Sequence, residues 1–60
     1  MDAQAVEAHA IRLYEALGPK AIAHAAQRAT EADDAGKPDD AHSWRRIEER
    51  LKERRGAHES

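Results

Sequence analysis

The chain has 60 residues, no cysteine and a formal net charge of −2 at pH 7. A chain of this length forms at most one small domain and buries only about 60% of its unfolded surface, which does not favour an enzyme with its own enclosed active site. Acidic and basic residues nearly cancel, so the basic excess typical of nucleic-acid-binding proteins is missing. We therefore expect one small domain over residues 1–60, with no cofactor and no catalytic residues.

Large apolar side chains are few. Fourteen residues are alanine, and the large apolar residues are Met1, Val6, Ile11, Leu13, Tyr14, Leu17, Ile22, Trp44, Ile47 and Leu51. Small domains with so thin a core usually need a disulfide, a metal, a partner or oligomerisation, and the lack of cysteine excludes the disulfide. We expect a homo-oligomer, with a dimer favoured, and we keep a larger protein partner as a further option.

Glycine and proline divide the chain into three predicted helices, at about residues 2–17, 19–35 and 38–55. The dividing segments are Gly18-Pro19 and Gly36-Lys37-Pro38. Glycine accepts the left-handed conformation just past a helix end, and proline fits the first turn of the next helix. Alanine, glutamate, arginine and leucine, which dominate the composition, favour helix over strand. The predicted fold class is all-α, a small three-helix unit, with a frayed tail at residues 56–60.

The first predicted helix is amphipathic. Val6, Ala10, Leu13 and Leu17 recur at spacings of four, three and four, so they share one helical face. Tyr14 widens this face. The pattern indicates that the helix buries this side in a bundle or dimer seam.

The junction at Gly18-Pro19 has no spacer residue. The first helix therefore either turns back through a tight corner or continues into the second helix with a kink, and the sequence leaves both arrangements open. In either one, Ile11 and Tyr14 need a second surface, which another copy of the chain would supply. These two residues are surface candidates for partner binding.

The last two predicted helices form an antiparallel hairpin, because only a three-residue turn joins them. Trp44, Ile47 and Leu51 repeat along the third helix. Pairing across the turn sets them opposite alanines and Ile22, so that large residues face small ones. The expected core and seam residues are Val6, Leu13, Leu17, Ile22, Trp44, Ile47 and Leu51.

The histidines do not predict a metal site. Residues 9, 24, 42 and 58 are histidine, and no two of them share a helical face at the spacing of known metal ligands. A zinc site shared across a dimer is the one metal arrangement that stays open.

Glu31, Asp33 and Asp34 lie at the carboxyl end of the second helix, where the helix dipole disfavours negative charge. Early fraying of the helix, or pairing with Arg45 or Arg46, would offset this, and a basic partner is the alternative explanation.

Arg46, Arg50 and Arg54 are four residues apart and form a basic strip on the third helix. Such a strip could follow the phosphates of a nucleic acid. Glutamates flank it, however, and basic residues are expected near a helix C-terminus. The balance does not favour nucleic-acid binding, which we keep as an alternative.

No apolar run approaches the roughly 20 residues that cross a bilayer. Asp2 and Glu7 stand where a secretory signal would carry basic residues. We therefore expect a cytoplasmic protein with no membrane partner.

The order of several short motifs resembles a group of short alphaproteobacterial all-helical proteins classed as a domain of unknown function. The motifs are Ala10-Ile11-x-Leu13-Tyr14, Leu17-Gly18-Pro19-Lys20-Ala21, His24-Ala25-Ala26-Gln27-Arg28-Ala29, Ala35-Gly36 and Ala41-x-x-Trp44-x-x-Ile47-x-x-x-Leu51. The resemblance covers about residues 8–52. It implies a small helical fold and no particular activity.

From these observations we expect a non-enzymatic protein–protein interaction or adaptor module that self-associates through amphipathic helices. A small nucleic-acid-associated regulator that uses the basic strip, or an accessory subunit of a larger assembly, is the alternative.

Overall fold

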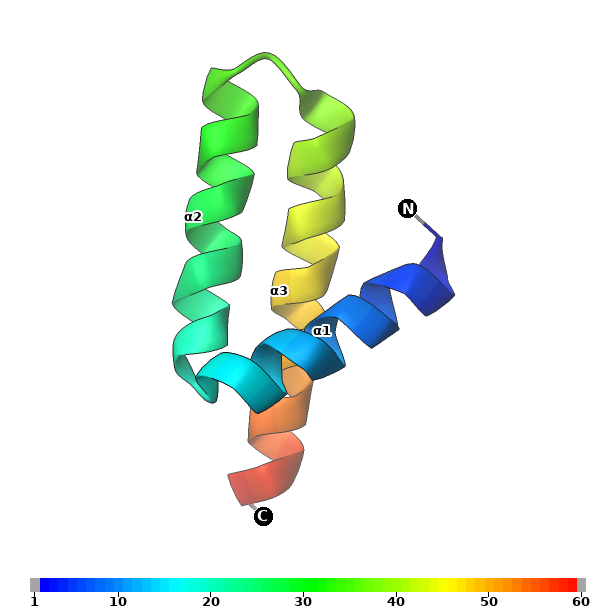
Figure 1. Cartoon of the computed structure of the whole chain (residues 1–60), viewed down its shortest axis with the longest axis vertical. Helices are drawn as coiled ribbons and strands as arrows, with labels where there is room; N and C mark the ends of the chain where they lie inside the picture. Colours follow the sequence, from blue (N-terminus) through cyan, green and yellow to red (C-terminus); the bar gives the residue numbers. More distant parts are fainter. Residues whose placement is uncertain (1, 60) are drawn as a thin grey trace.

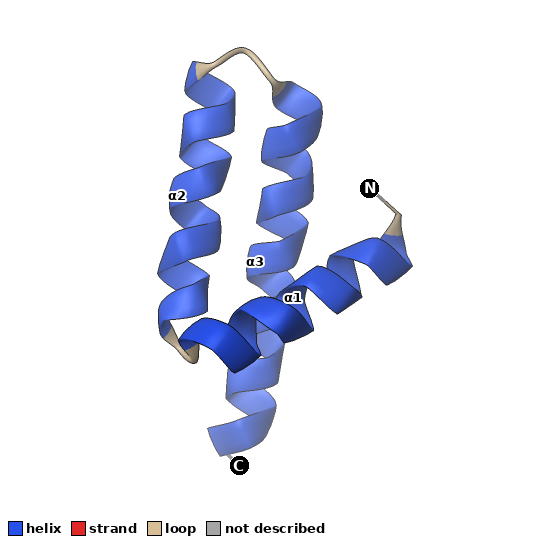
Figure 2. Ribbon diagram, viewed as in Figure 1, coloured by secondary structure: helices blue, strands red, loops and turns tan. Residues whose placement is uncertain are grey.

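The computed structural model describes the backbone of residues 2–59 and the side chains of residues 2–54. It contains three helices, α1 (Ala3–Leu17), α2 (Lys20–Asp34) and α3 (Pro38–Glu59), and the described residues include no strand (Figure 2). The all-α prediction and the division into three helices are confirmed.

Asp2 and Gly18 define the two ends of α1. The Asp2 side chain accepts a hydrogen bond of 2.8 Å from the Ala5 backbone N–H, which satisfies one of the free donors at the helix start. At the other end, the Gly18 N–H donates to the Tyr14 carbonyl oxygen at 2.7 Å. Gly18 has φ 62° and ψ −143°, a conformation open mainly to glycine. The chain therefore leaves α1 through a tight corner, and the kinked continuous helix is excluded.

Gly36 ends α2 with paired hydrogen bonds of the Schellman type. The Lys37 N–H donates to the Ala32 carbonyl oxygen at 2.8 Å, and the Gly36 N–H donates to that of Asp33 at 3.1 Å. Gly36 has φ 72°, the left-handed conformation that this motif requires. Pro38 then opens α3, as predicted from its preference for the first helical turn.

The structure extends α3 beyond the predicted end at residue 55. The helix continues through Gly56 to Glu59, so residues 56–59 of the predicted frayed tail are helical. Glycine in a helix costs only about 1 kcal/mol relative to alanine, which does not by itself end a helix. Residue 60 lies outside the described residues.

The α2–α3 hairpin is the most closely packed part of the molecule. Its α2 side is made of buried alanines and its α3 side carries Ile47 and Leu51, both with no exposed surface. Because alanine methyl groups leave room, the larger side chains of α3 fill the space between the helices. Among the residues whose side chains are described, the buried hydrophobic ones are Val6, Ala10, Ala21, Ala25, Ala29, Ala32, Ala41, Ile47 and Leu51.

Helix α1 crosses the hairpin near its open end and packs mainly on α3 (Figure 1). Val6 and Ala10 are its buried residues. The C-terminal part of α3 projects past this crossing, and the α2–α3 turn lies at the opposite end of the molecule (Figure 1). The molecule measures 37 × 21 × 18 Å along its principal axes, so these two ends are far apart.

Candidate interaction surface

Trp44 lies where all three helices meet. Its ring is 5.1 Å from the ring of His9 on α1 and 5.9 Å from that of His24 on α2, measured between centroids. Trp44 is half-buried and packs against the core. One aromatic side chain of α3 therefore contacts both other helices.

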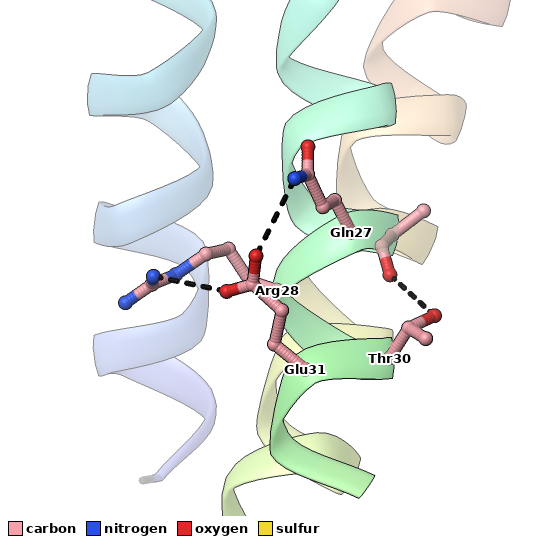
Figure 3. Close-up of polar contacts among 5 residues, drawn as sticks. Gln27, Arg28, Thr30 and Glu31 are labelled. Atoms are coloured by element: carbon pink, nitrogen blue, oxygen red, sulfur yellow. Dashed lines mark hydrogen bonds and ion pairs between the residues drawn. The ribbon is translucent and has the colours of Figure 1, made fainter. Parts of the chain in front are cut away.

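Arg28 completes this group, which we call the Trp44 cluster: His9, His24, Arg28 and Trp44. The Arg28 guanidinium carbon lies 5.6 Å from the centre of the Trp44 ring, within the range of a cation–π contact. Arg28 also pairs with Glu31 at 3.2 Å. Figure 3 shows Gln27 and Arg28 both directed to the Glu31 carboxylate, with the Gln27 amide donating at 3.4 Å.

An open depression on the surface adjoins the Trp44 ring. Arg28 and Glu31 of α2, Asp40 of α3 and Lys37 of the turn lie around it. The charges of both signs that surround it select neither an anionic nor a cationic ligand.

The basic strip of α3 is partly engaged within the chain. Arg50 Nε lies 3.6 Å from Glu7 Oε2, and Arg54 Nη2 lies 3.7 Å from Glu7 Oε1. Arg50 Nη1 also lies 3.7 Å from Glu53 Oε1. One carboxylate of α1 thus lies between two guanidinium groups of α3. Arg46 is exposed and makes no ion pair with the residues whose side chains are described.

Asp33 pairs with Arg45 across the hairpin, one of the two arginine partners expected from the sequence. The hydrogen bond to Asp33, together with the attraction of its carboxylate, raises the pKa of Arg45 above its ordinary value. Because the pKa of Arg45 is raised, its contribution to stability is lost on the alkaline side as the pH rises through strong alkali. Both side chains are about half exposed, so the pair contributes little to stability.

Charge is separated along the molecule. Between residues 31 and 40, at the hairpin turn, there are five carboxylates and one lysine; we call this segment the acidic turn. Residues 50–54 of α3 carry three basic side chains, Arg50, Lys52 and Arg54, and one carboxylate, Glu53; we call these three basic residues the basic end. Glu7 of α1 offsets part of their charge. Lys52 also reaches Glu48 at 3.2 Å.

Only some of the predicted core and seam residues are buried within one chain. Val6, Ile47 and Leu51 are fully buried. Leu13, Ile22 and Trp44 pack against the core but stay half-buried. Leu17 is 40% exposed, because the helix ends there and the chain turns away.

Ile11 and Tyr14, the two predicted surface candidates, are both half-buried, and Tyr14 packs against the core. Glu7, Ile11 and Tyr14 follow one another at spacings of four and three, so they lie on one flank of α1. Since Glu7 contacts Arg50 and Arg54, this flank faces the projecting part of α3. We call the surface formed by Ile11, Tyr14, Arg50 and Arg54 the α1–α3 corner.

The sequence did not indicate that Glu7 would contact the basic strip, or that His9 and His24 would lie close to Trp44. Both sets of contacts depend on the direction in which α1 crosses the hairpin. The spacing of residues along one helix does not determine that direction.

Within the described residues, no group of three or more histidine, cysteine or carboxylate side chains could hold a metal ion. None of the helices in that part of the chain is long and apolar enough to cross a membrane. Comparisons with protein-family models, with curated proteins and with solved structures give no match to this chain, and the resemblance described under Sequence analysis stays a prediction.

Proposed function

We propose that the chain is a non-enzymatic protein–protein interaction module, and that its first partner is a second copy of itself. The observation that supports this most directly is the distribution of large apolar side chains. Only Val6, Ile47 and Leu51 are fully buried, while the other large apolar residues with described side chains remain half-buried or exposed: Ile11, Leu13, Tyr14, Leu17, Ile22 and Trp44.

The molecule has enough surface for such an interface. The chain exposes 4257 Å², close to the roughly 3,900 Å² of a compact monomer of its mass. A standard protein interface covers about 800 Å² on each partner, which is roughly a fifth of this surface. A second copy could therefore cover the half-buried residues of one side of the molecule.

A nucleic-acid role has less support. A nucleic-acid backbone that followed the basic strip would meet the Glu7 carboxylate, which lies 3.6 Å from Arg50 and 3.7 Å from Arg54 and repels phosphates. We expect no mobility shift of random duplex DNA or RNA with this protein at low salt. A shift that disappears as salt is added would favour the alternative.

The test of self-association is the molar mass in solution, measured by sedimentation equilibrium from micromolar to millimolar concentration. We expect a mass that approaches twice the 6.7 kDa of one chain. Ile11→Ser should weaken this association, because Ile11 lies outside the buried core. Ala8→Ser, on the exposed side of α1, is the matched control and should not. A single-chain mass at every concentration would refute the proposal.

A further inference from the structure

We propose that the two copies associate antiparallel, with the acidic turn of each copy docked against the α1–α3 corner of the other. This arrangement rests on the self-association proposed above. It specifies which surface meets which, and it follows from where charge and apolar surface lie on the molecule.

The charges of two antiparallel copies are complementary along the long axis. The acidic turn and the basic end lie at opposite ends of a molecule 37 Å long (Figure 1). Two copies side by side and parallel would bring like charges together at both ends. An antiparallel pair brings opposite charges together at both ends, and a two-fold axis makes the two contacts equivalent.

The α1–α3 corner combines apolar surface with a basic rim. Ile11 and Tyr14 are half-buried there, and the side chains of Arg50 and Arg54 are 46% and 41% exposed. Glu7 offers one carboxylate to two arginines at distances of 3.6 and 3.7 Å. Because these contacts are long, both guanidinium groups can donate hydrogen bonds to a further carboxylate.

The acidic turn is the segment that docks on the corner of the other copy. Asp34, Asp39 and Asp40 of the acidic turn are exposed, as are Ala35 and Pro38 beside them. Unlike Asp33, which pairs with Arg45, these three aspartates make no ion pair with any residue whose side chain is described. The segment therefore offers carboxylates next to small apolar groups, which matches the corner.

The experiment uses two charge reversals, Asp34→Lys at the acidic turn and Arg54→Glu at the basic end. Each variant alone places like charges at both contacts of an antiparallel dimer. We expect each variant to raise the dimer dissociation constant about tenfold, because the modest energy of a surface charge pair is lost at both contacts. Asp34→Lys should not harm the fold of one chain, since a positive charge suits the end of α2.

Mixing the two variants gives the decisive result. In a heterodimer one contact pairs Asp34 with Arg54 and the other pairs the two introduced residues, so both contacts are again between opposite charges. Native mass spectrometry should show heterodimer well above the statistical half and a return to wild-type affinity. A variant that unfolds alone still tests the arrangement, because the mixture must regain the dimer.

In the matched control, the Arg12→Glu variant takes the place of the Arg54→Glu variant in the mixture. It makes the same change of charge at an exposed residue of α1 that lies beside His9 and is not one of the residues that form the corner. Asp34→Lys mixed with Arg12→Glu should give no excess of heterodimer. If the wild-type chain dimerises and the Asp34→Lys and Arg54→Glu mixture shows no excess, the antiparallel arrangement is wrong. If the wild-type chain is a monomer throughout, the proposed self-association itself fails.

Discussion

Trp44 joins the three helices through contacts with His9, His24 and Arg28. Because it is half-buried, Trp44→Ala should lower the free energy of unfolding by roughly 2–3 kcal/mol, below the 3–5 kcal/mol typical of a fully buried aromatic residue. Trp44→Phe should retain most of this stability. Urea denaturation followed by circular dichroism at one fixed protein concentration measures both. An alanine variant with an unchanged midpoint would contradict the role of Trp44.

Glycine is required at position 36 because of the backbone conformation there, and not because a side chain would lack space. A Cβ atom at this position would meet nothing within 4 Å, but φ is 72°. Gly36→Ala should therefore cost about 1–2 kcal/mol, the strain of a left-handed residue with a side chain. Lys37→Ala, at the next residue, should change the stability little. If Gly36→Ala leaves the denaturation midpoint unchanged, the turn tolerates another backbone geometry.

At the scale of single residues, the sequence predicts contacts that depend on one helix or one short turn. The Asp33–Arg45 pair follows from the three-residue turn, and Glu48 with Lys52 follows from helical spacing. The contact of Glu7 with Arg50 and Arg54 depends on how α1 crosses α3. Glu7 is about 45 residues from Arg50 and Arg54 in the sequence, so no local sequence pattern indicates that these side chains are close.

At the scale of elements, the close approach of α2 and α3 depends on the alanines of α2. Ala25 has no exposed surface, so Ala25→Leu should overpack the hairpin and destabilise it by about 1–3 kcal/mol. Ala23→Leu adds the same side chain to the exposed side of α2 and should be close to neutral. Thermal melting of the two variants side by side measures the difference. Equal melting temperatures would mean that the hairpin is not tightly packed at Ala25.

Helix positions were predictable because glycine and proline mark the turns, but helix orientation and one helix end were not. Gly18 allows either a corner or a kink, and only its actual ψ of −143° directs α1 back across the hairpin. The end of α3 was placed too early because Gly56 was interpreted as a stop. A single glycine weakens a helix without ending it.

At the scale of the whole molecule, three helices share a core in which three large apolar side chains of residues 2–54 are fully buried. The sequence predicted this scarcity from its alanine content. It could not predict which apolar residues would remain half-buried, since that depends on the crossing of α1. The structure contains one chain, and the second copy is our proposal to account for the half-buried residues at its surface.

If association with a second copy stabilises the fold, the temperature of thermal unfolding depends on the protein concentration. For a dimer that unfolds to separate chains, mass action raises the melting temperature as the protein concentration rises. We expect the midpoint, followed by circular dichroism, to increase steadily from micromolar to millimolar protein, together with a mass of two chains by sedimentation. One sharp transition at the same temperature at every dilution, from a species with the mass of a single chain, would contradict the claim.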